Sequence, residues 1–213
     1  MNNVLEKICK FGVVPVVVLE NVEDAEPLAK ALCEGGLPCA EITFRTKAAE
    51  ESIRIMSEMF PHMLIGAGSV ITTEQVDKAM GAGAKFIVSP GINTKIVKHC
   101  QEKRILITPG CMTPSEIEQA IECGLSVVKF FPAEILGGVE MVKAIAAPYG
   151  KMKFIPTGGV NATNVKDYLS FNKVIACGGS WMVKSNLIKE KKFDKIVELT
   201  KEAVEIVRES RGE

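Results

Sequence analysis

This 213-residue sequence has little histidine, few aromatic side chains and no excess of either charge. The two histidines, His62 and His99, lie far from any cysteine cluster at metal-ligand spacing, which argues against a zinc site. Lys plus Arg and Asp plus Glu each number 26, so the formal net charge is zero. This balance argues against a general nucleic-acid or membrane-surface binder but is compatible with a small local anion site.

Cysteine pairs at C-x-x-C spacing and long hydrophobic runs are also absent. The seven cysteines are odd in number and scattered, which predicts reduced thiols in a cytoplasmic protein rather than a disulfide framework. The apolar run at residues 13–19 contains Pro15 and is too short to span a bilayer. Glu6 precedes this run and no small-residue cleavage site follows it, which argues against a signal peptide.

What the sequence does contain is a series of short apolar runs that alternate with amphipathic segments. Several runs are rich in β-branched residues and are bounded by Gly or Pro, as strands are. The segments between them repeat apolar residues with helical spacing, and one has Thr113 as cap, Pro114 at the first position and Gly124 as terminator. The eight runs cover residues 13–19, 39–44, 63–68, 85–90, 105–110, 126–132, 153–159 and 173–179.

Alternating strands and helices favour parallel pairing, because each helix then acts as a crossover. The most economical α/β arrangement is a closed (β/α)₈ TIM barrel, formed as a single domain over residues 1–213. We expect an N-terminal helix within residues 1–12 to close the bottom of the barrel and a long C-terminal helix to cover residues 187–211. An open doubly wound sheet is the competing arrangement, although no G-x-G-x-x-G motif opens the first helix.

A lysine stands in the middle of the run at residues 126–132. Lys129 lies between two valines and two phenylalanines, although lysine is among the residues least often buried. Period-two alternation groups it with Val127 and Phe131 on the face predicted to line the barrel interior. Burial disfavours the charged form of an amine, and a neutral amine attacks carbonyl carbon to give a Schiff base. The competing interpretation is a strand-end lysine that extends to water.

The run at residues 39–44 offers the partners that such chemistry needs. Alternation groups Glu41 with Thr43 and Arg45, although this assignment turns two apolar side chains toward the helices. A partly buried Glu41 suits acid–base work, and the planar fork of Arg45 suits a substrate carboxylate. A structural ion pair at the barrel rim is the alternative for these two residues.

Glycine pairs follow the last two predicted strands, at Gly158-Gly159 and Gly178-Gly179. Loops after strands 7 and 8 of a barrel frequently bind phosphate through backbone amides. Glycine pairs also occur in tight turns that bind nothing. Their presence at both of the expected strands favours the anion site. The hydroxyl of Ser180 fits the same anion site.

Seven motifs follow one another along nearly the whole chain: EITFRT (41–46), GAGSV (66–70), SPG (89–91), PGCMTPSE (109–116), VKFFPAE (128–134), PTGG (156–159) and GGSW (178–181). Together they closely resemble the 2-keto-3-deoxy-6-phosphogluconate (KDPG) aldolase family of class I, Schiff-base aldolases. Bacterial members often also act as 4-hydroxy-2-oxoglutarate (KHG) aldolases. The resemblance implies a cytoplasmic homotrimer that needs no cofactor or metal and acts on a phosphorylated 2-keto acid, in Entner–Doudoroff or uronate breakdown.

The resemblance also implies a role for each matching residue. Lys129 occupies the Schiff-base position, Glu41 that of the general acid/base, and Arg45 that of the group binding the pyruvate carboxylate. Ser69 stands where the family usually has threonine and keeps the hydroxyl that would bind the same carboxylate. The remaining matches line the pocket, at Pro90, Phe131 and Thr157, or the phosphate end, at Gly158, Gly159, Gly179 and Ser180.

Three other functions stay open at this point. A sugar-phosphate isomerase or epimerase would share the glycine-rich phosphate end but would need no interior lysine. A barrel that binds a phosphorylated metabolite without turnover is a second alternative. The third is the 2-keto-3-deoxy-6-phosphogalactonate aldolase, whose substrate differs at one stereocentre, and Thr157 is the residue that favours the gluconate form.

Overall fold

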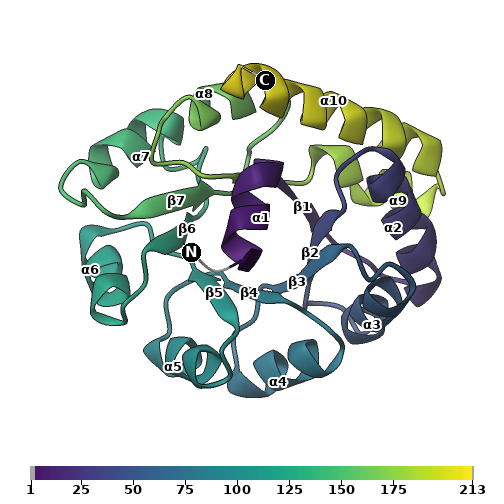
Figure 1. The fold of residues 1–213 in the computed structure, drawn as a ribbon, viewed down its shortest axis with the longest axis horizontal. Helices are drawn as coiled ribbons and strands as arrows, with labels where there is room; N and C mark the ends of the chain where they lie inside the picture. The colour runs from purple at the N-terminus through teal and green to yellow at the C-terminus, as the bar shows by residue number, and fades with distance from the viewer. Residues whose placement is uncertain (1–2, 213) are drawn as a thin grey trace.

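Eight short strands, each parallel to its neighbours, curve into a ring in the computed structural model, which describes residues 3–212 (Figure 1). The strands are β1 Val13–Val17, β2 Cys39–Thr43, β3 Leu64–Gly68, β4 Phe86–Ser89, β5 Leu106–Pro109, β6 Val127–Phe130, β7 Lys153–Pro156 and β8 Cys177–Gly179. They pair as a six-stranded sheet in the order β5-β4-β3-β2-β1-β8 and a two-stranded sheet of β6 and β7.

Single parallel bridges join the two sheets and close the ring. Gly110 bridges to Lys129 between β5 and β6, and Thr157 bridges to Gly178 between β7 and β8. The predicted (β/α)₈ barrel is therefore confirmed. The eighth apolar run is less regular than expected, because only its last three residues form β8 and Val174 joins the ring through an isolated bridge to Phe154.

Helices follow the strands and surround the ring, with their apolar faces against it (Figure 1). Local signals set their ends: Thr113 and Glu116 form a reciprocal capping box at the start of one helix, and Gly124 beyond its end has φ of 74°. The helices are α1 Asn3–Phe11, η1 Val22–Asp24, α2 Ala25–Glu34, α3 Ala49–Met59, α4 Thr73–Gly81, α5 Thr94–Glu102, α6 Pro114–Glu122, α7 Gly138–Ala146, α8 Val165–Leu169, η2 Trp181–Val183, α9 Ser185–Lys189 and α10 Phe193–Arg211. No helix within residues 3–212 is both long and apolar enough to cross a membrane.

The predicted continuous helix over residues 187–211 is wrong, because α9 and α10 are separate. Lys191 adopts a left-handed conformation with φ of 55°, and the amide of Lys192 donates to the carbonyl of Leu187, which ends α9. The ammonium group of Lys191 pairs with the carboxylate of Asp24, which is buried. The chain thus turns at the residue that satisfies this buried charge, and α10 then begins at Phe193.

The amphipathic segment expected within residues 1–12 forms α1, which lies across one end of the ring (Figure 1); residues 1 and 2 lie outside the described part. Two of its side chains, Leu5 and Ile8, are buried in the barrel interior. They join a cluster of inward-facing residues that includes Val14, Cys39, Leu64, Phe86, Val88, Val127, Ile155 and Ala176. α1 therefore closes the amino-terminal end of the barrel with apolar side chains.

We expect Ile8→Ala to lower the free energy of unfolding by about 2–5 kcal/mol, because truncation leaves a cavity in the closed end of the barrel. Lys7→Ala, an exposed change in the same helix, is the matched control and should stay within about 0.5 kcal/mol of the parent. Urea unfolding of the three proteins, followed by circular dichroism, measures both. Equal stability of the two variants would show that α1 does not close the interior.

Candidate active site

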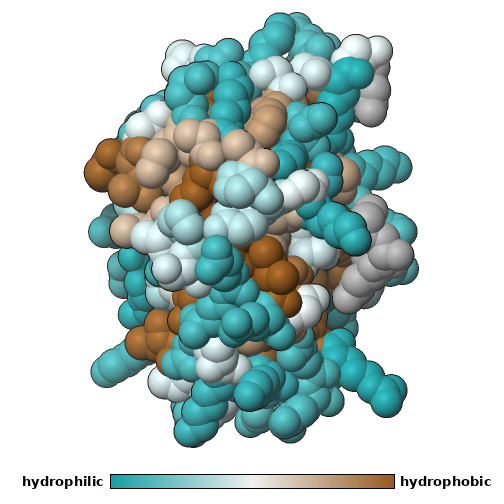
Figure 2. Space-filling view, turned by 90° about the vertical axis from the view of Figure 1, so that its left-hand side faces the viewer, coloured by the Kyte–Doolittle hydropathy of each residue, from teal (hydrophilic) through white to brown (hydrophobic). Residues whose placement is uncertain are grey.

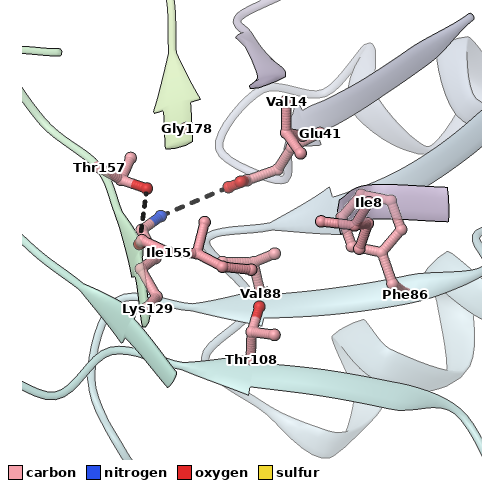
Figure 3. Close-up of a pocket in the computed structure, with 10 residues that line it drawn as sticks. All are labelled: Ile8, Val14, Glu41, Phe86, Val88, Thr108, Lys129, Ile155, Thr157 and Gly178. Atoms are coloured by element: carbon pink, nitrogen blue, oxygen red, sulfur yellow. Dashed lines mark hydrogen bonds and ion pairs between the residues drawn. The ribbon is translucent and has the colours of Figure 1, made fainter. Parts of the chain in front are cut away.

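The side chain of Lys129 points from β6 into the barrel interior, as alternation predicts (Figure 3). Only 6% of it is exposed, and its neighbours Val128 and Phe130 face the helices instead. Its Nζ lies 3.6 Å from Oε1 of Glu41, which projects inward from β2 and is 5% exposed. An amine and a carboxyl group therefore meet inside the ring, from strands on different sides of it.

The carboxylate of Glu41 is incompletely satisfied by the protein. The 3.6 Å separation from Nζ is longer than a direct hydrogen bond, and Oε1 has no hydrogen-bond partner among the described residues. Thr43, the next inward residue of β2, is also buried with an unpaired hydroxyl. Buried polar atoms are nearly always hydrogen-bonded, so these two oxygens are available to a bound molecule.

Glycines on adjacent strands make room for the functional side chains. A Cβ atom on Gly68 of β3 would lie 2.0 Å from Glu41 Oε1, and one on Gly178 of β8 would lie 2.4 Å from Thr157 Oγ1. The sequence pattern assigns Gly178 to an anion-binding glycine pair. Gly68 instead leaves space for the carboxylate itself, because any larger residue on β3 would displace it.

A cavity of about 10 Å³ lies between Lys129 and the apolar floor that α1 supplies (Figure 3). This is about the space of one water molecule. Besides Lys129 and Glu41, its polar lining comes from Thr108 and Thr157, and Ile8 belongs to its apolar lining. Thr108 is a residue that sequence reasoning missed, although its place in the run at residues 105–110, two residues before Gly110, could have indicated an inward side chain.

The other predicted substrate residues lie at the carboxyl ends of the strands, on the rim of the barrel. The ring of Phe131 has its centroid 5.2 Å from Lys129 Nζ, close enough for a cation–π contact. Ser69 is half-buried directly after β3, and Pro90 is exposed directly after β4. Arg45 follows β2 and is exposed, and it lines a separate hollow with Glu20 rather than the interior cavity.

The two predicted glycine pairs are brought together by the bridge between Thr157 and Gly178, which joins the carboxyl ends of β7 and β8. Gly158 and Gly159 have φ of 97° and 83°, values that favour glycine. Within residues 3–212, their amides donate to no acceptor. Gly179 packs against the indole of Trp181, and Ser180 is exposed beside it. Only the pair Gly158-Gly159 forms a turn at the rim, because Gly178 and Gly179 are the last two residues of β8.

Thiols near the site are not the nucleophile. Burial and, to a lesser degree, Glu116 raise the pKa of Cys111 to about 12. Burial also raises the pKa of Cys39 and Cys177 strongly, so all three stay protonated at neutral pH. Among residues 3–212, no group of three His, Cys, Asp or Glu side chains could hold a metal ion. The amine of Lys129 remains the candidate nucleophile of this interior.

An inward lysine beside a carboxylate, under the rim of a parallel barrel, suits the chemistry of Schiff-base aldolases. The family model described as KDPG and KHG aldolase matches residues 4–199. The chain belongs to this family, and it is accordingly an aldolase of the lyase class.

Relatives and solved structures agree over most of the chain. A 2-dehydro-3-deoxy-phosphogluconate aldolase of Haemophilus influenzae is 47% identical over 96% of this chain and 97% of its own. The KDPG aldolase of Zymomonas mobilis with 3-phosphoglycerate superimposes with a TM-score of 0.90 at 36% identity, over 96% of each chain. The KDPG aldolase of Legionella pneumophila, with pyruvate captured as a covalent carbinolamine, has a TM-score of 0.90 at 38% identity, over 94% of this chain and 97% of that one.

We expect Gly68→Ala to lower the turnover number for aldol cleavage by about 10²-fold or more, because the added methyl group displaces the Glu41 carboxylate and removes acid–base catalysis. Steady-state kinetics measure the effect, and circular dichroism checks that the variant is folded. Gly81→Ala is the matched control, since a Cβ there meets no atom within 4 Å. A folded Gly68→Ala enzyme with parental turnover would contradict the role of this glycine.

Proposed function

We propose that this chain cleaves 2-keto-3-deoxy-6-phosphogluconate to pyruvate and glyceraldehyde 3-phosphate through a Schiff base on Lys129. The observation that carries the proposal is the buried pair of Lys129 Nζ and Glu41 Oε1, 3.6 Å apart, with Oε1 free of other partners in residues 3–212. Membership of the aldolase family and the carbinolamine of the Legionella enzyme support the same chemistry.

The first half of the reaction joins the enzyme to the substrate. Neutral Nζ of Lys129 attacks the C2 ketone, and a proton from Glu41 helps the resulting carbinolamine to lose its oxygen as water. The iminium that remains is an electron sink. Glu41 then removes the proton of the C4 hydroxyl, the C3–C4 bond breaks, and its electron pair forms an enamine while C4 leaves as the aldehyde of glyceraldehyde 3-phosphate.

The second half restores the enzyme. Glu41 returns its proton to C3 of the enamine, which regenerates the iminium of pyruvate. Water adds to the iminium carbon, and collapse of the carbinolamine releases pyruvate and the free amine of Lys129. One carboxylate serves every proton transfer, which fits its position beside Nζ and the absence of a hydrogen-bond partner for Oε1 within residues 3–212.

The rim residues would bind the two ends of the substrate. We assign Arg45 and the hydroxyl of Ser69 to the carboxylate of the pyruvyl half, and Phe131, Pro90 and Thr157 to the walls of the pocket. The exposed guanidinium of Arg45 would swing inward on binding, since it lies on a loop beyond β2.

The phosphate end would be formed by Gly158, Gly159, Gly179 and Ser180. Two amides in the turn after β7, which donate to no acceptor within residues 3–212, and the hydroxyl directly after β8 would supply donors for a dianion without a charged side chain. The 3-phosphoglycerate of the Zymomonas structure is a three-carbon phosphate of the same size as the expected product.

A second activity on 4-hydroxy-2-oxoglutarate, giving pyruvate and glyoxylate, follows from the same lysine chemistry. The description of the matching family names both substrates. The unphosphorylated substrate would use the pyruvyl end of the site and forgo the glycine turns. The phosphogalactonate substrate differs only at C4, and we assign the gluconate preference to Thr157, whose side chain is buried near Lys129.

The chain is further proposed to form a homotrimer. Large apolar side chains are exposed on loops at the carboxyl ends of the strands, with Ile71 at 58%, Met112 at 41% and Ile135 at 87%. Apolar patches also lie among polar ones on the side that carries α6 and α7 (Figure 2). Exposed apolar surface is typical of an interface, and zero net charge removes repulsion between identical copies.

Borohydride reduction in the presence of pyruvate should add one reduced pyruvate, on Lys129, because the imine forms only on the buried amine. Intact-protein mass spectrometry and peptide mapping measure the adduct. Lys129→Ala should accept no adduct and should lose turnover, whereas Lys153→Ala, on the neighbouring strand, should behave as the parent does. An adduct on another lysine, or none on the parent, would refute the Schiff-base assignment.

Ile135→Asp should shift the assembly from trimer toward smaller species, because it places a charge in the apolar interface. Sedimentation velocity of parent and variant measures the shift. Met59→Asp is the control, since Met59 is also exposed but ends α3 at the opposite end of the barrel. A monomeric parent, or an Ile135→Asp variant of parental mass, contradicts the proposal.

A further inference from the structure

A tyrosine from the outer ring of helices hydrogen-bonds a glutamate beside the glycine turns. Tyr168 of α8 is 1% exposed, and its hydroxyl donates to Oε1 of Glu134, which lies in the loop between β6 and α7. α7 and α8 are neighbours on the outside of the barrel (Figure 1). The catalytic scheme above uses neither residue, so this contact needs its own explanation.

Glu134 is in direct contact with the proposed phosphate turn. Its amide donates to the carbonyl of Gly158 over 3.0 Å. A Cβ atom on Gly159 would lie 2.5 Å from both Cβ and Cγ of Glu134, so the stem of the side chain packs on that glycine. The carboxylate side chain of Glu134 therefore lies next to the turn in which the amides of Gly158 and Gly159 donate to no acceptor within residues 3–212.

The carboxylate of the same side chain lies beside Gly138 and the hydroxyl of Tyr168. A Cβ atom on Gly138, at the start of α7, would lie 3.4 Å from Glu134 Oε1 and 3.6 Å from the Tyr168 hydroxyl. The stem thus lies over Gly159 and the carboxylate lies over Gly138. Burial and the hydrogen bond to Glu134 raise the pKa of Tyr168, so its hydroxyl remains a donor at every working pH.

We propose that Tyr168 is a positioning residue that holds the Glu134 carboxylate away from the phosphate group of the substrate and so sets the affinity for phosphorylated substrates. Without the hydroxyl, Glu134 is free to rotate about its stem toward the turn, where its negative charge opposes that of the phosphate. This inference rests on the proposed phosphate end at Gly158 and Gly159.

Tyr168→Phe keeps the buried ring and removes only the hydroxyl. We expect its KM for 2-keto-3-deoxy-6-phosphogluconate to rise about fivefold to tenfold, because a like charge now lies beside the phosphate. The turnover number and the rate of borohydride trapping with pyruvate should stay within about twofold of the parent, since neither depends on phosphate affinity. Tyr149→Phe is the matched control, because that hydroxyl contacts Glu118 and Pro114, away from the site.

A charge-removing second change separates positioning from simple loss of structure. In Tyr168→Phe/Glu134→Gln the freed side chain is neutral, so KM should return to within about twofold of the parent. Glu134→Gln alone keeps an acceptor for the tyrosine and should leave KM unchanged or lower. A double variant that keeps the raised KM, or a Tyr168→Phe enzyme with slowed pyruvate trapping, overturns the proposal in favour of a merely structural hydrogen bond.

Ser180→Ala tests the phosphate end independently of the tyrosine. A raised KM in Ser180→Ala with a parental KM in Tyr168→Phe overturns the positioning role and leaves the phosphate end standing. Parental KM values in both variants overturn the phosphate assignment as well. Pyruvate trapping on Lys129 decides the lysine chemistry separately, since pyruvate carries no phosphate.

Discussion

The limited space inside the barrel determines which side chains can meet there. The site depends on glycines on some strands that leave room for larger side chains from others. Glu41 can extend toward Lys129 because β3 has a glycine, Gly68, beside the carboxylate. In the same way, Gly178 of β8 leaves room for the side chain of Thr157. The functional side chains fill the space that these glycines leave, and close packing gives them no room to move apart. The lysine and its carboxylate are therefore held in one geometry.

The two ends of the barrel have opposite characters, which gives the buried pair its reactivity. α1 closes one end with Leu5 and Ile8, so the space beneath the lysine is apolar and nearly filled. The other end carries the exposed hydroxyl of Ser180 and the amides of Gly158 and Gly159, which donate to no acceptor within residues 3–212. A charge in such an interior interacts more strongly with its partners than it would in water. In the proposed mechanism, a substrate that enters from the polar rim would complete an environment in which Lys129 and Glu41 exchange protons with little competition from solvent.

Periodicity predicted the barrel and the inward direction of Lys129 and Glu41, because alternation along a strand is a local property. Helix boundaries such as that of α6 were also predictable, since a capping box is read from adjacent residues. The break before α10 was not, because it depends on Lys191 reaching Asp24 from across the chain. Two further features could not be predicted, because they also depend on residues that are distant in the sequence. They are the space that Gly68 leaves for the Glu41 carboxylate and the contact of Tyr168 with Glu134.

Residues 129–134 connect the two ends of the proposed substrate site. Lys129 lies in β6, and five residues later Glu134 packs on the glycine turn that follows β7. The amides of Ala133 and Glu134 donate to the carbonyls of Thr157 and Gly158, so the backbone of this stretch continues the pairing of β6 with β7 beyond both strands. The distance between the reactive amine and the anion-binding turn is then set by main-chain hydrogen bonds rather than by flexible side chains. Under the proposed function, the ketone and the phosphate of the substrate would lie at the two ends of that rigid spacing, so the position of one glutamate at its far end would adjust the affinity for the phosphate.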